Sequence, residues 1–499
     1  KEERMSSSCC SHKKQHQNFL SRGLSTHKIA VSMFSENRNR LVDRFHDAPQ
    51  NSVIVLAGGV DECRNDTDHE LPFRQESFFN WAFGVEEPCF YGVIHIATRQ
   101  AVLLMPRLPQ EYAVWMGAIK SKEHFLEVYE TDRVEFVDDL AQVLEAFAPE
   151  KVFVLKGTNP DSGNDFKAPT HEALAKYADI TDFERLYREM GECRVFKSEK
   201  ELDVMRYICK VSSDAHVHVM KNVRPGMMEY QLESLFEHYC YFHGGCRHVG
   251  YHCICATGEN SSILHYGHAG APNNRLLGEN DTALMDMGGE YFCYGADITC
   301  SYPASGKFND NQRFVYQTVL NAVKAVEAVM KPGVSWVDLH LLAEKVILQR
   351  LIEFGYLIGD IDEINEKEIG FIFMPHGLGH LLGLDTHDAG GYGPGLPERP
   401  KRKGVNRLRT ARVLQKGMVL TVEPGLYFNP ATLVPAFENP DISKYFNREK
   451  IEPLFNFGGV RIEDNVTVTE DGIEHLSNVP REIDDIEAVM AGAPWPRQN

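Results

Sequence analysis

The second half of the chain is organised around one stretch, Leu284-Met285-Asp286-Met287-Gly288-Gly289-Glu290-Tyr291-Phe292-Cys293-Tyr294-Gly295-Ala296-Asp297-Ile298-Thr299. Its two aspartates are eleven positions apart, which on one extended strand would separate them by roughly 36 Å. The apolar residues around them indicate buried strands, where a carboxylate without a cation is costly. We therefore expect a hairpin with its midpoint between Tyr291 and Phe292, which would place Asp286 opposite Asp297. Two aspartates that only cap turns are the alternative.

Three more acidic or imidazole side chains follow in distinctive local settings. His380 ends the run His376-Gly377-Leu378-Gly379-His380, where two glycines argue against a regular helix. Glu423 follows the β-type run 419–422, and Glu463 follows the β-type run 459–462. Either glutamate alone is weak evidence for a metal site. Together with the two aspartates and His380, they complete a set of metal ligands.

The complete set has the composition of a site for two metal ions. Four carboxylates and one imidazole form a hard, oxygen-rich shell, which favours Mn²⁺, Fe²⁺ or Co²⁺ over a thiolate-type zinc site. Their combined charge of about −4 can balance two divalent ions, as in bridged dimetal hydrolases. The sequence thus predicts a hydrolytic enzyme with these metal ligands: Asp286, Asp297, His380, Glu423 and Glu463.

The composition of the chain indicates which classes of partner it can bind and in which compartment it lies. The chain has 499 residues, 43% hydrophobic and 25% charged, as expected of a globular protein with two or three domains. Its net charge of −19 argues against nucleic acid or an anionic membrane as a partner. No apolar run approaches the roughly 18 residues of a membrane helix. Twelve cysteines without a C-x-x-C pair indicate free thiols in a reducing cytoplasm.

The first part of the chain shows no catalytic spacing. Residues 1–23 are polar, lack a signal-peptide core and are expected to form a disordered leader. Residues 24–190 alternate β-branched runs with helical stretches, which predicts an α/β domain. Strands are expected at 52–56, 91–96, 101–105 and 151–155, and helices near 109–118 and 134–147.

A second domain is expected over residues 196–490. It opens with Ser198-Glu199-Lys200-Glu201, a capping-box pattern that predicts a helix to about Asn222. The order helix, basic-Pro-Gly, helix, Gly then occurs twice, at Arg224-Pro225-Gly226 and at Lys331-Pro332-Gly333, 107 residues apart. The repeat predicts a pseudo-two-fold α/β domain with a site at its junction, and chance similarity of two helical hairpins is the alternative.

With these residues in hand, the chain resembles the pita-bread metallopeptidases, whose ligand order is Asp, Asp, His, Glu, Glu. Its long motifs are most similar to those of the eukaryotic prolidases, the Xaa-Pro dipeptidases, and they lie at residues 73–79, 235–240, 264–272, 373–380 and 408–412. The resemblance covers roughly residues 34–492, whereas the leader does not match and residues 393–405 diverge. It implies an α/β (α+β) fold, with a creatinase/prolidase-like N-terminal domain and a pita-bread catalytic domain.

The resemblance also implies a function and a role for each site residue. The family hydrolyses dipeptides with C-terminal proline or hydroxyproline by attack of a metal-activated hydroxide. Asp297 and Glu463 would bridge two Mn²⁺ ions, Asp286 would bind one of them, and His380 with Glu423 would bind the other. A homodimer is implied as well, in which Trp115 is a candidate to approach the neighbour's site.

Further residues match catalytic or substrate-binding positions of that family. Glu423 would serve as general base, with His265 and His376 as further catalytic groups. The positions matched to dipeptide binding, or lying next to it, are His265, His387, Arg409, Tyr251 and Arg461.

Three other functions remain open on these residues. An aminopeptidase P-like enzyme would cleave longer X-Pro peptides with the same ligands. A non-catalytic pita-bread binding protein, or a creatinase-type amidinohydrolase, would lack part of the dimetal set. This chain retains all five ligands, which favours a peptidase.

Overall fold

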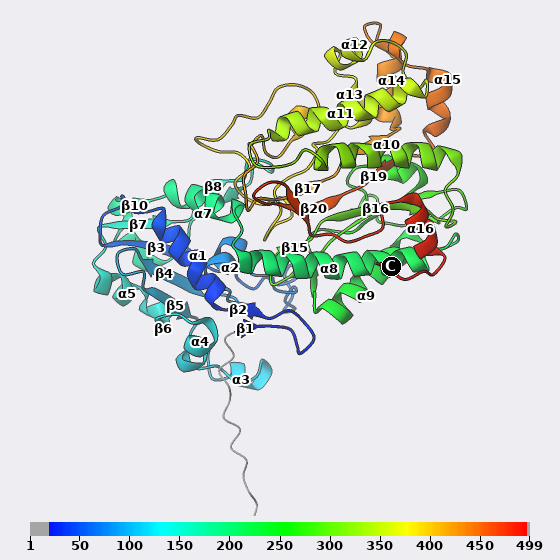
Figure 1. Cartoon of the computed structure of the whole chain (residues 1–499). Helices are drawn as coiled ribbons and strands as arrows, with labels where there is room; N and C mark the ends of the chain where they lie inside the picture. The colour runs from blue at the N-terminus through cyan, green and yellow to red at the C-terminus, as the bar shows by residue number, and fades with distance from the viewer. Residues whose placement is uncertain (1–18, 497–499) are drawn as a thin grey trace, which may run out of the picture.

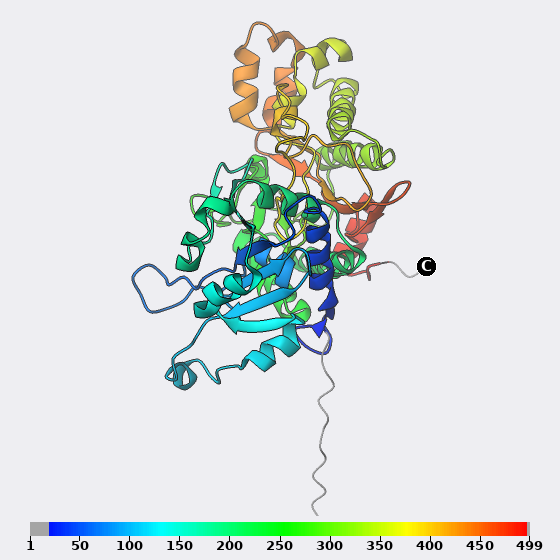
Figure 2. The same cartoon turned by 90° about the vertical axis from the view of Figure 1, so that its left-hand side faces the viewer.

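A computed structural model describes residues 19–496, which form an N-terminal α/β layer and a larger C-terminal unit (Figure 1). Figure 2 shows the first part, blue to cyan, at one end of the molecule and the orange segment around α14 at the other. Within residues 19–496, no helix is long and apolar enough to cross a membrane. All ten cysteines in this range are free and eight of them are buried, as predicted.

The N-terminal layer is a six-stranded sheet with the order β10-β7-β3-β4-β5-β6. β3 (Ser52–Ala57), β4 (Tyr91–His95) and β5 (Ala101–Met105) form an antiparallel meander. β7 (Lys151–Val154) and β10 (Thr181–Asp182) extend it in parallel beyond β3, and β6 (Arg133–Phe136) pairs in parallel with β5.

Successive side chains along a strand point to opposite faces of the sheet, and both faces of this sheet are apolar. Val53 and Val55 pack in the same cluster as residues of α5 (Leu140–Phe147). Ile54 and Leu56 belong to the main core, together with α1 (Ser32–Asp43) and α2 (Ser77–Phe83). Helices therefore cover both faces of the sheet, as expected where strands are apolar throughout.

The smaller elements of this part connect and cover the sheet. The helices are α3 (Tyr112–Trp115), α4 (Lys122–Tyr129), α6 (Glu172–Ala175) and α7 (Arg185–Val195). The short hairpins are β1 (Phe19–Leu20) with β2 (Ile29–Ala30), and β8 (Gly157–Thr158) with β9 (Asp165–Phe166).

All four predicted strands of this part are confirmed, but other expectations need correction. The helix predicted over 134–147 begins at Leu140, because Arg133–Phe136 pairs with β5 as an edge strand. The helix predicted over 109–118 is confined to α3. Residues 19–20 form β1, so the last part of the predicted leader, residues 1–23, is not disordered. The rest of the predicted leader, residues 1–18, lies outside the described residues.

The C-terminal unit begins with the predicted capping box. The Ser198 hydroxyl accepts the Glu201 N–H at 3.3 Å, and the Glu201 carboxylate accepts the Ser198 N–H at 2.9 Å. The helix α8 (Glu199–Asn222) then packs on α9 (Glu229–Gly244), as α10 (Asp310–Glu327) packs on α11 (Trp336–Glu353).

The predicted repeat has a structural counterpart at its two glycines. Gly226 and Gly333 have φ values of +86° and +91°, which a residue without a side chain adopts at little cost. Their N–H groups donate to the Leu277 and Leu414 carbonyls, both at 2.9 Å. Equivalent turns thus join the two helices of each pair and bond to the segments that precede β13 and β17, which supports the pseudo-two-fold arrangement.

Short antiparallel sheets lie beside these helices (Figure 1). The first half contains β12 (Ile254–Thr257), β13 (Thr282–Met287) and β16 (Ile298–Pro303), with β11 (His248–Val249), β14 (Gly289–Tyr291) and β15 (Tyr294–Gly295). The second half contains β17 (Val419–Val422), β20 (Asp464–Val468) and β21 (Ile473–His475), with β18 (Gly425–Tyr427) and β19 (Gly459–Arg461). The remaining helices are α12 (Ile361–Glu366), α13 (Gly370–Phe373), α14 (Pro430–Glu438), α15 (Arg448–Ile451) and α16 (Ile483–Met490).

The hairpin between the two aspartates exists, but its predicted register is wrong. The turn residues are Phe292 and Cys293, with φ values of +49° and +68°, so the turn lies one residue later than expected. Two left-handed residues form a tight hairpin turn whose twist matches that of the strands. Asp286 consequently pairs with Thr299, and Asp297 lies diagonally across rather than directly opposite.

We expect Gly288→Ala to destabilise the protein. A Cβ atom at this position would collide with the backbone carbonyl of Ala296 on the other arm of the hairpin. Forcing the arms apart should lower the free energy of unfolding by about 1–3 kcal/mol, measured by urea denaturation. Gly472→Ala is the control, because a Cβ there meets nothing within 4 Å. Wild-type stability of Gly288→Ala would contradict this close approach.

Candidate metal centre

The five predicted ligands line a single cavity of about 680 Å³. Asp286 lies in β13 and Asp297 immediately before β16, whereas Glu423 follows β17 and Glu463 connects β19 to β20. His380 lies in the irregular loop after α13. Each half of the pseudo-two-fold unit therefore supplies two carboxylates, at the junction that the repeat predicted.

Backbone hydrogen bonds bring these separate segments together. The Glu423 N–H donates to the Leu378 carbonyl at 2.8 Å, and the Thr421 N–H donates to the His380 carbonyl at 3.0 Å. The Glu463 N–H donates to the Thr299 carbonyl at 3.2 Å. The histidine loop is thereby attached to β17, and the Glu463 segment is attached to β16.

The ligand atoms form a compact group. His380 Nε2 lies 3.3 Å from Asp297 Oδ2 and 3.5 Å from Glu423 Oε1. One ligand atom each from Asp297, His380 and Glu463 lie within 4.8 Å of one another. Asp286 is connected to this group of ligand atoms through the Tyr251 hydroxyl, which lies 2.5 Å from Asp286 Oδ1 and 2.6 Å from Asp297 Oδ1.

The buried carboxylates carry more negative charge than their surroundings balance. Burial raises the pKa of Asp286 to about 7, although Arg461 opposes this effect at 2.5 Å. Burial and the neighbouring carboxylates raise the pKa of Glu463 well above its usual range. The one hydrogen of the Tyr251 hydroxyl can serve only one of its two carboxylate contacts. Divalent cations would resolve both problems, so the donor set fits a metal centre.

Three neutral histidines surround the metal ligands. His265, His376 and His387 line the cavity, and burial lowers the pKa of each, that of His376 to about 3. They are therefore uncharged at pH 7, and each can donate one hydrogen bond as a neutral imidazole. His376 is held by the Tyr427 hydroxyl at 3.0 Å from Nε2 and by the Gly377 carbonyl at 2.7 Å from Nδ1.

Arg461 and Tyr251, two of the predicted substrate-facing residues, are engaged with other protein groups. Arg461 is 4% exposed and donates to Thr299 Oγ1 at 3.1 Å, to the Tyr427 hydroxyl at 2.8 Å and to Asp286. These contacts favour a role in holding Asp286. Tyr427 joins Arg461 to His376 and was not found from the sequence, where its only signal is its place in the short strand after Glu423.

Arg409 lines the cavity with its side chain 29% exposed, which leaves it accessible to a ligand. Its Nη1 lies 3.7 Å from Asp161 Oδ2, in the turn of the β8–β9 hairpin. Arg399 binds the same carboxylate at 2.6 Å and donates to the Leu408 carbonyl at 2.6 Å. The N-terminal part thus helps to position Arg409, a contribution that the sequence did not reveal. Arg407 also lines the cavity.

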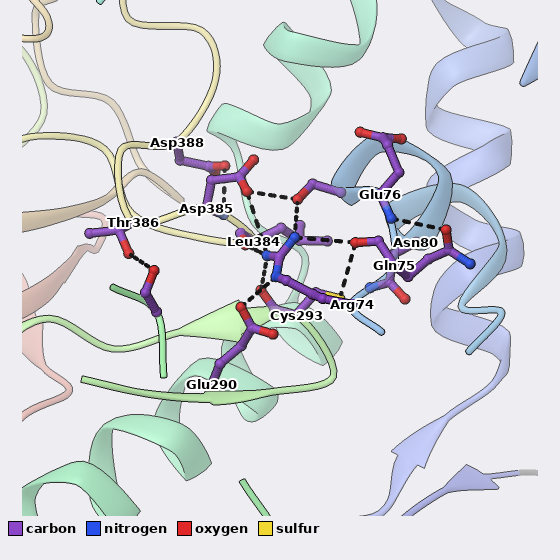
Figure 3. A network of polar contacts seen from close by, with 12 residues as sticks. Arg74, Gln75, Glu76, Asn80, Glu290, Cys293, Leu384, Asp385, Thr386 and Asp388 are labelled. Carbon is purple, nitrogen blue, oxygen red and sulfur yellow. Dashed lines mark hydrogen bonds and ion pairs between the residues drawn. The ribbon is translucent and has the colours of Figure 1, made fainter. Parts of the chain in front are cut away.

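The loop that carries His387 is attached to the N-terminal part (Figure 3). Arg74 donates to the Leu384 carbonyl at 2.6 Å and pairs with Glu290, in the hairpin between the aspartates, at 2.7 Å. Ser77 Oγ donates to Asp385 Oδ1 at 2.7 Å.

The other side of His387 is fixed by a buried ion pair. Asp388 lies 2.5 Å from Arg194 and 2.9 Å from Lys197, and all three side chains are fully buried. Arg194 also pairs with Asp385 at 2.7 Å. His387 therefore lies between two anchored neighbours, which limits how far its ring can move.

Comparison with known proteins agrees with this architecture. The profile of metallopeptidase family M24 matches residues 203–470, and that of the aminopeptidase P N-terminal domain matches residues 34–154. The Xaa-Pro dipeptidase of Homo sapiens is 50% identical over 473 residues, covering 94% of this chain and 95% of that protein. A probable Xaa-Pro aminopeptidase of Talaromyces stipitatus is 34% identical, covering 88% of this chain and 93% of that protein.

A solved structure shows the same fold over nearly the whole chain. The aminopeptidase PepP of Pseudomonas aeruginosa has a TM-score of 0.77 at 30% identity, and the match covers 94% of this chain and 99% of that chain. The predicted fold class, an N-terminal α/β domain followed by a catalytic unit of the aminopeptidase P type, is confirmed. The chain belongs to metallopeptidase family M24.

Proposed function

We propose that this chain is an Xaa-Pro dipeptidase, which hydrolyses dipeptides with proline or hydroxyproline at the C-terminus. One observation carries the proposal: a complete five-residue metal-ligand set and the accessible guanidinium of Arg409 line the same cavity. The higher identity to the human Xaa-Pro dipeptidase, 50% against 34% for the fungal aminopeptidase, supports a dipeptidase.

Two Mn²⁺ ions per chain are the proposed cofactor. Asp286 would hold one ion, His380 and Glu423 the other, and Asp297 and Glu463 both. The single imidazole among four carboxylates supports Mn²⁺ over ions that prefer sulfur or nitrogen ligands. When bound, such a pair supplies Lewis acidity that activates water and polarises the substrate carbonyl.

The chain's own residues would move the protons. Burial raises the pKa of Glu423 against the opposing effect of His380 and Arg461, so its carboxylate is a better base for the attacking water. His265, His376 and His387 are neutral at pH 7, because burial lowers their pKa values, and the N–H of a neutral imidazole is too weakly acidic to protonate the leaving nitrogen. Glu423 is therefore the group that returns the proton to the proline nitrogen as the C–N bond breaks.

The histidines would act as hydrogen-bond donors. A neutral imidazole N–H of His265 or His387 can stabilise the oxyanion that develops on the carbonyl oxygen. His376, held by Tyr427 and Gly377, keeps a fixed ring orientation beside this position. Arg461 holds Asp286, so it supports the metal ligands rather than the substrate.

The chemistry of the substrate explains the separate enzyme. A peptide bond to proline has no N–H, so proteases that bind substrates through that hydrogen bond lose it. A dipeptide offers a free carboxylate immediately after the proline, and a planar guanidinium binds a carboxylate through two donors. Arg409 is the proposed partner of that carboxylate, with His265 and His387 beside it.

The two alternative functions, cleavage of longer peptides and non-catalytic binding, are not equally supported. Cleavage of longer X-Pro peptides is the second candidate, because the aminopeptidase relatives share the fold and a substantial part of the sequence. A non-catalytic binding protein is disfavoured, because membership of a metallopeptidase family coincides with a complete ligand set.

We further propose a cytoplasmic homodimer. Val114, Trp115 and Met116 on α3 are 75%, 77% and 54% exposed, and such an apolar patch supports contact with a second copy. The ten free cysteines support a reducing compartment.

Substrate length provides the direct test of the proposed function. After chelation and reconstitution with Mn²⁺, we expect kcat/KM for cleavage of the X–Pro bond in Gly-Pro to exceed that in Gly-Pro-Gly-Gly by at least about 30-fold. This ratio corresponds to about 2 kcal/mol for one charge pair. Equal or faster cleavage of the tetrapeptide would assign the aminopeptidase activity instead.

Arg409→Ala should remove the discrimination between a free and a blocked C-terminus. The partly exposed pair is worth about 2–3 kcal/mol, so kcat/KM for Gly-Pro should fall about 30- to 150-fold. The rate on Gly-Pro amide, which lacks the charge, should change little. Lys403→Ala, at an exposed position of the same loop, serves as control. An unchanged ratio of Gly-Pro to Gly-Pro amide rates would place the carboxylate partner elsewhere.

Mn²⁺ should stabilise the folded protein more strongly at pH 7 than at pH 5.5. In the metal-free protein the pKa of Asp286 is about 7, above its unfolded value of about 3.9. The protonated Asp286 therefore contributes its full stabilisation of the folded state below about pH 3.9, and this stabilisation is lost as the pH rises through 7. Mn²⁺ binds only the deprotonated carboxylates. From Asp286 alone the apparent affinity should therefore rise about sixfold per pH unit between pH 5.5 and 7, and the raised pKa of Glu463 adds to this dependence.

Thermal unfolding of chelator-treated protein with increasing Mn²⁺ at each pH measures this effect. Asp286→Asn is the control variant and should show a weaker pH dependence. A gain in Tm that is equal or larger at pH 5.5 would contradict the electrostatic account of the cavity.

A further inference from the structure

A second cluster of metal-ligating side chains lies outside the cavity already described. Glu327 is the last residue of α10, Asp464 is the first of β20, and His475 is the last of β21. One ligand atom from each of the three lies within 4.8 Å of the others. None of them lines the cavity of the metal centre.

Glu327 has an oxygen atom without a partner. Its side chain is 14% exposed, and the Oε1 atom is buried and accepts no hydrogen bond. The nearest cationic candidate is His475 Nδ1 at 3.8 Å, which is beyond hydrogen-bond reach. Burying a carboxylate oxygen without a hydrogen-bond donor is costly, so the arrangement favours a bound cation.

Asp464 has one oxygen atom left to offer. Its Oδ1 accepts from Ser477 Oγ at 2.6 Å and from Arg481 Nη2 at 2.9 Å. Both bonds use the same oxygen, so Oδ2 is available to a ligand. Arg481 balances the charge of Asp464, whereas Lys324 on the last turn of α10 pairs with Glu482. Arg481 and Lys324 act on Glu327 only from a distance, because each is paired with another carboxylate.

We propose that Glu327, Asp464 and His475 bind a divalent transition-metal ion, for which Zn²⁺ has the best-matched chemistry. One imidazole and two carboxylates with a water molecule complete a four-coordinate zinc site. With bonds of about 2.1 Å, tetrahedral ligand atoms lie about 3.4 Å apart, so atoms now within 4.8 Å of one another need to close by at most about 1.4 Å. His475, whose side chain is 50% exposed, gives the ion a route from solvent.

The position of the site indicates a structural ion. It would connect the end of α10 to both strands of the β20–β21 hairpin, and β20 begins immediately after the metal-centre residue Glu463. A proton is the competing occupant, because burial beside Asp464 raises the pKa of Glu327 to about 8. Zinc would displace this proton, raising Tm without entering the reaction.

Zinc content per chain tests the proposal. Wild-type protein, Glu327→Gln and His475→Gln would be saturated with Zn²⁺, freed of loose metal by gel filtration and analysed for zinc. We expect one zinc ion fewer per chain in each variant than in the wild type. The comparison is a difference, so it holds whatever number of ions the metal centre carries and whether or not the proposed dipeptidase activity is correct.

Controls separate this site from surface binding and from misfolding. His46→Gln removes an exposed histidine elsewhere and should leave the zinc content unchanged. Wild-type hydrolysis of Gly-Pro by the Mn²⁺-loaded variants would show that they fold, since none of the three residues belongs to the metal centre. Zinc should also raise the Tm of the wild type more than that of His475→Gln. Equal zinc content in the wild type and both variants would overturn the proposal and assign a shared proton to Glu327 and Asp464.

Discussion

Four carboxylates share one cavity in which the buried guanidinium of Arg461 pairs with Asp286, and the rest of the structure depends on how this charge is balanced. Burying an unpaired carboxylate costs several kcal/mol, so four of them within a few ångström cannot all be ionised without cations. Arg461 and Tyr251 relieve part of the repulsion around Asp286 and Asp297. Metal binding would therefore be linked to folding of the C-terminal unit, because bound metal would stabilise only the arrangement that brings both halves together.

The C-terminal unit supplies the residues that line the cavity, and the N-terminal part holds two of its loops in place. The strands of the C-terminal unit position the four carboxylates proposed as metal ligands, which lie in β13 or next to β16, β17 and β20. The irregular loops carry His387 and Arg409, and these loops are attached to the N-terminal part through Arg74 and Asp161. A domain without catalytic spacing thus restricts where these side chains, proposed to bind the substrate, can lie. This arrangement is consistent with function carried by loops on a rigid support.

Burial also separates the roles of the ionisable groups in the cavity. It lowers the pKa values of His265, His376 and His387, which become neutral hydrogen-bond donors, and it raises that of Glu423, which becomes a better base. The same desolvation acts in opposite directions because it always disfavours the charged form. The proposed general base and the proposed oxyanion donors are thereby distinguished by one physical effect.

Much of the site could be predicted from sequence because its chemistry is local. The ligand types, the capping box of Ser198 and the paired glycines 226 and 333 each depend on a few neighbouring residues, and the structure contains them as expected. The register of the hairpin could not be predicted, because it depends on Phe292 and Cys293 adopting left-handed conformations that no side chain there requires. Tyr427, Asp161 and the partners of Arg461 escaped prediction for a related reason: their contacts join residues far apart in the chain, and no local spacing records which segments will pack together.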